Sequence, residues 1–295
     1  MNGDQLRKVR SGQGFIAALD QSGGSTPNAL KAYGIDGDQY SGDDEMFELM
    51  HAMRSRIITS PSFEGDQIVG AILFEDTMDR DIGGRSTTSY LWDTKRVVPF
   101  LKVDKGLAIE HHGVQVMNPI PALASLLSRA AQFGVFGAKM RSLIKRACGA
   151  GITAVVDQQF HLANQIIASG LVPIIEPEVD VSSPEKGKAE EILRESIDDH
   201  LAHLGPHQYV ILKLSLPDVD DFYCDLVRHP NVLRVLALSG GYSQNEANLR
   251  LLANHGLVAS FSRALTEGLS VHQTDEEFNS TLQQSISGIF EASIA

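Results

Sequence analysis

The chain has 295 residues, of which 43% are hydrophobic and 21% are charged, a composition typical of a folded globular protein and unlike that of a disordered one. Its formal net charge of −12 argues against general nucleic-acid binding, which needs a basic surface. It does not exclude a small anionic substrate, because a few cations focused in a cleft can dominate the local potential.

Cysteine content and hydropathy indicate the compartment. The two cysteines, Cys148 and Cys224, are too few for a disulfide framework, which favours a reducing environment. The N-terminal stretch 1–10 lacks the apolar core of a signal peptide, and no window approaches the run of about 18 apolar residues that spans a membrane. We therefore predict a cytoplasmic protein with no membrane partner and no nucleic-acid partner.

Short apolar runs alternate with longer helix-like segments along the whole chain. The apolar runs predict eight strands, at 14–20, 67–74, 97–103, 135–139, 171–176, 209–214, 232–238 and 256–260. Helical spacing and capping signals predict helices at 43–59, 122–133, 152–169, 184–204 and 218–227, and further helices that begin near Pro27, Ser243 and Thr274.

Eight strands that alternate with helices, without a linker-like stretch, predict the α/β class and a single (β/α)8 TIM barrel over residues 1–295. A doubly wound sheet is the runner-up fold. Its dinucleotide-binding version is weak, because no G-x-G-x-x-G motif follows a strand. In a TIM barrel the active site forms at the carboxyl ends of the strands, so residues at those ends are the candidates for chemistry.

Charged and hydroxyl residues gather at these predicted strand ends. Because side chains alternate along a strand, Lys139 shares a side with Arg141, and Glu176 shares a side with Glu178. Surface charges usually scatter along helix faces, so this clustering indicates a site. The strand-end candidates are Asp20, Glu75 or Asp76, Lys102, Lys139, Arg141, Glu176, Glu178, Lys213, Ser239, Ser260 and Arg263.

Lys213 lies inside the apolar stretch 209–217, which is typical of a buried strand. Burying an ammonium group is costly, so one interpretation is a partly neutral amine that attacks a carbonyl. The alternative is a structural lysine that reaches water or pairs with a carboxylate, and this stretch by itself favours that alternative.

The neighbouring candidates favour the nucleophile. A cation such as Lys139 would help to keep the Lys213 amine neutral, and Glu176 would protonate a carbinolamine hydroxyl so that it leaves as water. Asp20 would orient or ionise a substrate hydroxyl. Clustered histidines that would hold a zinc ion are not visible, and we expect neither a metal nor a cofactor.

Two glycine-rich turns suggest anion sites. Ser239, Gly240 and Gly241 precede a helix and offer main-chain N–H groups to a phosphate, with Arg263 as a bidentate cation. The run from Ser22 to Ser25 offers a second site, with Lys102 nearby. Each signal has an ordinary alternative: Gly-Gly turns are usually only turns, Lys102 would suit a structural ion pair, and the Glu176-Pro-Glu178 segment would suit a loop cap.

Seven segments together resemble class I fructose-1,6-bisphosphate aldolases of the short bacterial type. They occur in the family's order and cover the chain from Gly14 to about Leu265. The segments are Ala17-Ala-Leu-Asp-Gln-Ser-Gly-Gly-Ser25, Phe100-Leu-Lys-Val-Asp-Lys-Gly106, Ala138-Lys-Met-Arg141, Pro173-Ile-Ile-Glu-Pro-Glu178, Ile211-Leu-Lys213, Leu238-Ser-Gly-Gly241 and Ser260-Phe-Ser-Arg-Ala-Leu265.

The resemblance implies a barrel that reversibly cleaves fructose 1,6-bisphosphate into dihydroxyacetone phosphate and glyceraldehyde 3-phosphate. By position, Lys213 resembles the Schiff-base lysine, Glu176 the acid/base with Glu178 beside it, and Asp20 the carboxylate that engages the C4 hydroxyl. The resemblance assigns other residues to the reacting carbons (Lys139, Arg141), to the phosphate next to the imine (Ser239, Gly240, Arg263) and to the distal phosphate (Ser22, Ser25, Lys102). Gly241 and Ser260 are further substrate-binding candidates.

Three departures from the family pattern qualify these expectations. The chain ends at Ser293-Ile-Ala295 without the tyrosine-ended tail of animal enzymes, so the proton shuttle is open. Ser262 stands where the family has a glycine, and Ala29 stands where animal enzymes have an arginine. Alternatives are a Schiff-base aldolase for another sugar phosphate such as sedoheptulose 1,7-bisphosphate, or a non-catalytic sugar-phosphate-binding protein. A homo-oligomer is compatible with the sequence.

Overall fold

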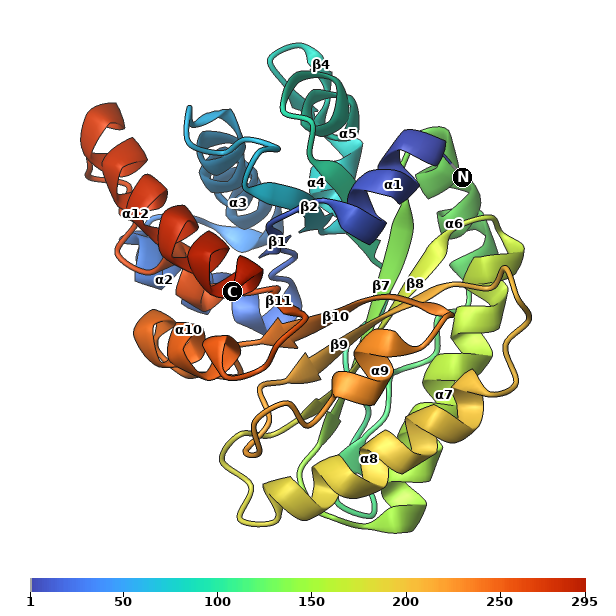
Figure 1. The fold of residues 1–295 in the computed structure, drawn as a ribbon. Coiled ribbons are helices and arrows are strands. Elements are labelled where there is room, and N and C mark those ends of the chain that lie inside the picture. The colour runs from blue at the N-terminus through green and yellow to red at the C-terminus, as the bar shows by residue number, and fades with distance from the viewer. Residues whose placement is uncertain (1) are drawn as a thin grey trace.

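The computed structural model describes residues 2–295, so Met1, the first residue of the N-terminal stretch considered above, lies outside the described residues. Eight strands form a barrel in the order β1-β2-β5-β7-β8-β9-β10-β11, and neighbours in this order pair in parallel (Figure 1). In that order they span Phe15–Leu19, Ile68–Leu73, Val98–Lys102, Gly137–Ile144, Val172–Val179, Val210–Ser215, Val232–Leu238 and Leu257–Ala259. The Ala18 N–H donates to the Phe261 carbonyl at 3.2 Å and joins the two edges of the sheet. The predicted (β/α)8 fold is confirmed.

Helices follow the strands and surround the barrel (Figure 1). The α-helices are α1 (Gly3–Ser11), α2 (Thr26–Tyr33), α3 (Gly42–Thr59), α4 (Glu75–Asp79), α5 (Thr87–Ser89), α6 (Leu123–Gln132), α7 (Gly149–Ala168), α8 (Lys186–Leu201), α9 (Cys224–Arg228), α10 (Gln244–Leu252), α11 (Arg263–Thr266) and α12 (Asp275–Ile294). Short elements complete the chain: η1 (Gly23–Ser25), η2 (Tyr90–Thr94), the hairpin of β3 (Asp81–Ile82) and β4 (Arg85–Ser86), and β6 (Val114–Gln115), which pairs antiparallel to β7.

The inside of the barrel is a packed apolar core and not a pore. Large side chains from alternate strand positions fill it, including Ile16, Phe100, Ile174 and Ile211, and none of these is more than 1% exposed. Helix α1, which the sequence did not predict, adds the buried Val9 to the same core. It lies beside β2 and β10. The Asn2 side chain caps it by accepting from the Asp4 and Gln5 N–H groups.

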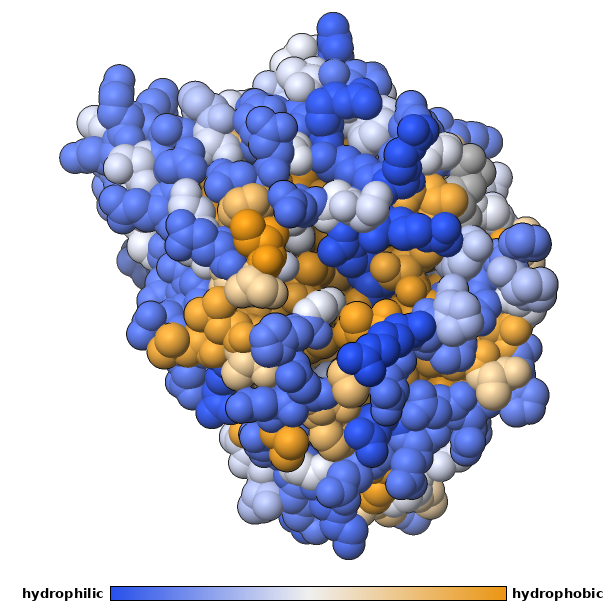
Figure 2. Space-filling view, viewed as in Figure 1, coloured by the Kyte–Doolittle hydropathy of each residue, from blue (hydrophilic) through white to orange (hydrophobic). Residues whose placement is uncertain are grey.

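A second apolar layer lies between the barrel and the helices that cover it. It includes the inner faces of α7, α8 and α12, represented by Val155, Leu193 and Ile286, all fully buried. Hydrophilic residues cover most of the face seen in Figure 2, and hydrophobic residues gather across its middle. Within residues 2–295, no helix combines the length and the apolar character needed to cross a membrane.

Two strands are longer than predicted, and two candidate residues therefore lie inside strands. Strand β7 continues to Ile144 and β8 to Val179, because the two pair along eight residues from Gly137–Val172 to Ile144–Val179. Arg141 and Glu178 therefore lie within strands and not in the loops beyond them.

The helix predicted at 218–227 is wrong over most of its length, because only Cys224–Arg228 forms a helix. Asp221 adopts a left-handed φ of 55°, which an α-helix cannot contain. Its carboxylate accepts from the His255 main-chain N–H at 2.8 Å, and the Asp218 carboxylate accepts from Lys186 Nζ at 2.9 Å. These contacts fix the segment as turns. The helix predicted at 184–204 is shorter than expected and spans Lys186–Leu201.

Candidate active site

Three adjacent strands bring two amines and one carboxylate together inside the barrel mouth. Lys139 of β7, Glu176 of β8 and Lys213 of β9 are each no more than 4% exposed. Glu176 Oε1 lies 3.0 Å from Lys213 Nζ, and Glu176 Oε2 lies 2.5 Å from Lys139 Nζ. The carboxylate therefore bridges both amines and is within proton-transfer distance of each.

Asp20, at the end of β1, completes this buried cluster by accepting from Lys139 Nζ at 2.9 Å. Burial raises the pKa of the Asp20 carboxyl, but Lys139 and Lys213 outweigh it and hold this pKa well below its ordinary range. Burial likewise raises the pKa of Glu176, and the same two lysines lower it below its ordinary value. Both carboxylates are thus ionised near neutral pH in the free protein.

Lys139 carries the positive charge that these carboxylates require. Burial lowers the pKa of the Lys139 ammonium, but Asp20 and Glu176 outweigh the burial and raise this pKa above its ordinary value. Lys139 therefore stays protonated and serves as a fixed cation.

The ladder between β8 and β9 is interrupted where the reactive groups lie. Its register pairs Ile174 with Ile211 and Ile175 with Leu212, and it includes no pair beyond these among the described residues. Further along, the Ser215 hydroxyl replaces the ladder: it donates to the Val179 carbonyl at 2.6 Å and accepts from the Val179 N–H at 3.0 Å. The strands are thus held together above and below the gap that holds Glu176 and Lys213.

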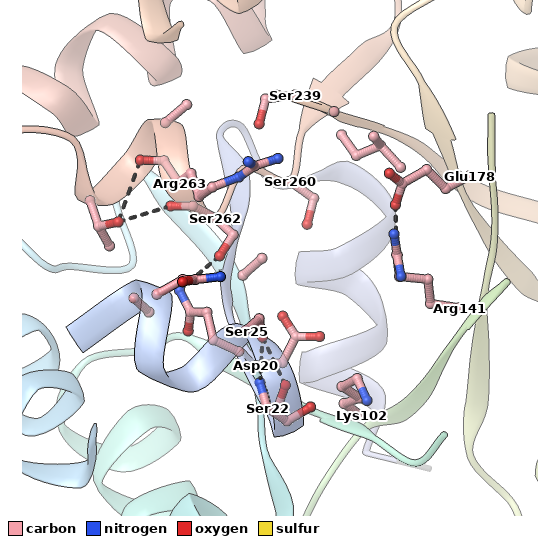
Figure 3. Close-up of a pocket in the computed structure, with 18 of the residues that line it drawn as sticks. Asp20, Ser22, Ser25, Lys102, Arg141, Glu178, Ser239, Ser260, Ser262 and Arg263 are labelled. Atoms are coloured by element: carbon pink, nitrogen blue, oxygen red, sulfur yellow. Dashed lines mark hydrogen bonds and ion pairs between the residues drawn. The ribbon is translucent and has the colours of Figure 1, made fainter. Parts of the chain in front are cut away.

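Two further ion pairs line the cavity. Arg141 Nε donates to Glu178 Oε2 at 2.6 Å, so Glu178 pairs with Arg141 (Figure 3). Lys102 Nζ donates to Asp104 Oδ1 at 2.7 Å. The structural ion pair that was one interpretation of Lys102 is therefore present, and Lys102 also lines the cavity.

The turn after β10 and the start of α11 form one end of the cavity. Gly240 and Gly241 have φ of 60° and 120°, values that favour glycine, and a Cβ on Gly240 would lie 2.4 Å from Val181 Cγ1. A Cβ on Gly241 would lie 3.6 Å from Arg263 Nη2, so this guanidinium lies against the turn. The Ser260 hydroxyl is buried here with no hydrogen-bond partner in residues 2–295, and Ser239 lies nearby (Figure 3).

The opposite end of the cavity contains the turn after β1. Ser22 and Ser25 close this turn: the Ser25 hydroxyl accepts from the Ser22 N–H at 3.0 Å and donates to the Ser22 carbonyl at 2.8 Å. Figure 3 shows these serines and Lys102 across the pocket from Ser239 and Arg263. The cavity has a volume of about 1120 Å³, and fourteen of the strand-end and turn residues predicted from the sequence line it. The remaining candidate, Glu75 or Asp76, does not, because both residues lie in α4.

Sequence reasoning missed three residues of this region. Asp104 lines the cavity, and its Oδ2 atom is buried without a hydrogen-bond partner within the described chain. Gln21 donates from Nε2 to the Ser262 hydroxyl at 2.8 Å. Arg54 of α3 is fully buried and donates to the Gln21 carbonyl at 2.5 Å and to Thr77 Oγ1 at 2.7 Å.

Arg54 is unusual because it is a buried cation that forms no ion pair within residues 2–295. Burial lowers the pKa of its guanidinium to about 10, against the opposing effect of Asp20 and Asp76. Arg54 contacts the Asp20–Gln21 turn through the Gln21 carbonyl and does not itself line the cavity. In the sequence, the only hint that a residue holds the main chain at Gln21 is that Gln21 is adjacent to Asp20.

We expect Arg54→Met to lower the free energy of unfolding by about 2–4 kcal/mol, because it leaves two buried acceptors, the Gln21 carbonyl and Thr77 Oγ1, without their donor. It should also lower kcat/KM by roughly tenfold, since a misplaced reacting group is costly. The control is Arg234→Met: Arg234 also donates to main-chain carbonyls, including that of Val9 at 2.7 Å, but at the α1 end of the barrel. Urea titration should show a loss of stability in both variants. An equal loss of kcat/KM in both would contradict a local role for Arg54.

Within residues 2–295, no three His, Cys, Asp or Glu side chains converge in a way that would hold a metal ion. The acid–base groups of the cavity are paired with lysine and arginine instead.

Comparison with known proteins gives consistent results. The sequence model of the family described as fructose-bisphosphate aldolase class-I, a glycolytic family, matches residues 5–192. The chain is 61% identical to a fructose-bisphosphate aldolase class 1 of Synechocystis sp. over 99% of this chain and 98% of the relative. It is 58% identical to that of Clostridium acetobutylicum over the full length of both.

A solved structure shows the same fold at much lower sequence identity. A fructose-bisphosphate aldolase from Plasmodium falciparum superimposes with a TM-score of 0.74 at 21% identity, covering 98% of this chain and 92% of that one. The likeness supports the barrel architecture.

Proposed function

The chain belongs to the class I fructose-bisphosphate aldolase family, and we propose that it cleaves fructose 1,6-bisphosphate reversibly through an imine on Lys213. The products are dihydroxyacetone phosphate and glyceraldehyde 3-phosphate. The observation that carries the residue assignment is the Lys213 amine, buried 3.0 Å from Glu176 in a cavity with a glycine-rich turn at each end. A protein that only bound sugar phosphates would not need a buried amine with an acid beside it.

Imine formation requires a deprotonated amine and an acid, and Glu176 is placed to provide both steps. Its ionised carboxylate takes a proton from the Lys213 ammonium, and the amine then attacks the C2 carbonyl of the open-chain sugar. A second proton moves from the nitrogen to the carbinolamine oxygen. Glu176 returns its proton to that hydroxyl, which leaves as water, so the carboxylate is restored and an iminium ion remains.

Cleavage then uses Asp20 and the iminium. The Asp20 carboxylate takes the proton of the C4 hydroxyl, the C4 carbonyl forms, and the electrons of the C3–C4 bond move to C3 and into the iminium. The low pKa of Asp20 keeps it ionised for this step. Lys139, which contacts both Asp20 and Glu176, stabilises the charges that move between them. Protonation of the resulting enamine and hydrolysis of the imine release dihydroxyacetone phosphate.

The two ends of the cavity would each hold one phosphate. Main-chain N–H groups of Gly240 and Gly241 and the Arg263 guanidinium suit the phosphate near Lys213. Ser22, Ser25 and Lys102 suit the distal phosphate. Arg141, paired with Glu178, lies between the ends and would contact the middle of the sugar.

The proposed setting is the cytoplasm, since Cys148 and Cys224 are both free thiols. We also propose that the chain forms a homo-oligomer. Light scattering after size exclusion would measure the mass directly, and a monomer at micromolar concentration would contradict the assembly.

The test of the function is an assay of fructose 1,6-bisphosphate cleavage, coupled to reduction of dihydroxyacetone phosphate, with and without a chelator. We expect cleavage at an equal rate in both arms, because the iminium and not a metal ion withdraws the electrons. Absence of cleavage, or inactivation by the chelator, would contradict the proposal. A higher kcat/KM for sedoheptulose 1,7-bisphosphate would assign the same chemistry to that sugar.

A further inference from the structure

Ser262 contributes a hydroxyl group to the lining of the cavity. It lies between β11 and α11, and its hydroxyl accepts a hydrogen bond from Gln21 Nε2 at 2.8 Å. Gln21 follows Asp20 at the end of β1, so this bond joins two turns that are 241 residues apart in sequence. Figure 3 shows Ser262 beside Arg263, on the side of the pocket that faces the turn with Ser22 and Ser25.

The hydroxyl hydrogen of Ser262 is available for a ligand. The contact with Gln21 uses an acceptor site of the oxygen, and Ser262 Oγ donates to no acceptor within residues 2–295. Although Ser262 occupies the N-cap position of α11, its side chain does not cap that helix. Ser262 lines the same end of the cavity as Gly241 and Arg263.

Gln21 is itself held in place from behind. Its carbonyl accepts from the buried Arg54 guanidinium at 2.5 Å, which fixes the main chain. Its Oε1 atom is buried without a hydrogen-bond partner in the described chain, while Nε2 points to Ser262. The Gln21 amide therefore donates to Ser262 Oγ, and the Ser262 hydroxyl hydrogen stays available for another acceptor.

We propose that Ser262 donates its hydroxyl hydrogen to the substrate phosphate nearest the imine, and that Gln21 is the positioning residue that orients it. This inference rests on the proposed function, because it takes the ligand at this end of the cavity to be the phosphate of the ketose. A phosphate bound there would also face Arg263 and the main-chain N–H groups of the Gly240–Gly241 turn. A hydroxyl whose oxygen is engaged by an amide adds a directed donor to this set.

The first test compares Ser262→Ala and Ser262→Gly with the wild type. Hydrogen bonds to charged groups are strong, so we expect KM for fructose 1,6-bisphosphate to rise about tenfold in both variants. The value of kcat should change less than about twofold, because the bond is made equally in the ground and transition states. The inhibition constant of inorganic phosphate, used as a competitive probe of this end, should rise by a similar factor.

The second test reverses the hydrogen bond between the two side chains. In Gln21→Glu both oxygens are acceptors, so the Ser262 hydroxyl turns to donate to the carboxylate and is lost to the phosphate. The added charge also repels the phosphate, and a double-mutant cycle separates the two effects. We expect Gln21→Glu to raise KM by a larger factor in the wild type than in the Ser262→Ala background.

A matched control pair exists elsewhere in the chain. Gln244 Nε2 donates to Ser285 Oγ at 2.5 Å between α10 and α12, and neither residue lines the cavity. Gln244→Glu and Ser285→Ala should leave KM and the phosphate inhibition constant unchanged, and thermal melting checks that every variant is folded. Values of KM within twofold of the wild type for both Ser262 variants, or equal effects of Gln21→Glu in the two backgrounds, would overturn the inference. A wild type that does not cleave the bisphosphate would instead refute the proposed function.

Discussion

Replacing Lys213 with methionine is expected to reduce kcat for fructose 1,6-bisphosphate cleavage by roughly 10⁴-fold or more, since loss of a covalent nucleophile removes the whole imine pathway. Methionine keeps most of the apolar stem of lysine, so the buried position beside Ile174 and Ile211 stays filled. The residual rate should depend little on substrate concentration above the wild-type KM, because the phosphate sites are unchanged.

Chemical trapping tests the same assignment directly. Borohydride added with dihydroxyacetone phosphate should reduce the imine to a stable secondary amine, and peptide mass spectrometry should place the adduct on Lys213. The variant without this amine should give no adduct. Cleavage at the wild-type rate by Lys213→Met, or an adduct on another lysine in the wild type, would contradict the imine mechanism at this position.

A second buried lysine serves as the control. Lys186 of α8 is 3% exposed and contacts Glu190 at 2.7 Å, Asp218 at 2.9 Å and the Leu216 carbonyl at 2.8 Å. These three acceptors match the three N–H donors of the ammonium group, and Lys186 does not line the cavity. Lys186→Met is therefore expected to lose stability while it keeps the Lys213 adduct, which separates burial of a lysine from its reactivity.

The strand-end residues could be predicted from sequence because two simple rules determine where they point. Strands read from apolar runs, together with the two-residue period of side chains, bring Lys139, Glu176 and Lys213 to one place, and the structure confirms this proximity. The sequence did not show that the Glu176 carboxylate lies between the two amines. That arrangement depends on side-chain distances across three strands.

The residues that sequence reasoning missed could not be found from local patterns. Arg54 lies in a helix predicted from its apolar spacing, and no periodicity distinguishes a buried arginine from a solvated one. Gln21 donates a hydrogen bond to Ser262, and no local pattern contains a contact between residues 241 positions apart. The failed helix at 218–227 shows the same limit, since tertiary contacts to Asp218 and Asp221 override local helix propensity.

Glu176→Gln is expected to slow cleavage by about 10²–10⁴-fold, because an amide can neither take the proton of Lys213 nor return it to the leaving hydroxyl. Borohydride trapping should still label Lys213, but at a lower rate. The readout is the rate of adduct formation under single-turnover conditions, compared with kcat. A variant that forms the imine at the wild-type rate would move the acid–base role to another residue of the cavity.

The same substitution should also destabilise the fold, with a defined dependence on pH. Glu176 neutralises two buried ammonium groups, and removing one partner of a buried ion pair costs about 3 kcal/mol. Because the folded-state pKa of Glu176 is lower than its ordinary value, its stabilising contribution is complete above the unfolded-state pKa. It is lost as the pH falls through the folded-state pKa. The difference in unfolding free energy between wild type and Glu176→Gln should therefore shrink below about pH 5.

Glu190→Gln provides the contrast that makes this pH dependence diagnostic. Glu190 is also a buried carboxylate paired with a lysine, but burial raises its pKa above the ordinary value despite Lys186. A raised carboxyl pKa favours the protonated form in the folded state, so acid pH does not remove stability through this group.

Urea titrations at pH 4.5 and 7 test this contrast. The difference in unfolding free energy between wild type and variant should become smaller in acid for Glu176→Gln and not for Glu190→Gln. Cleavage by Glu190→Gln should stay at the wild-type rate, because that carboxylate lies outside the cavity. Parallel pH profiles for the two variants would show that Glu176 is held by burial and not by its two lysines.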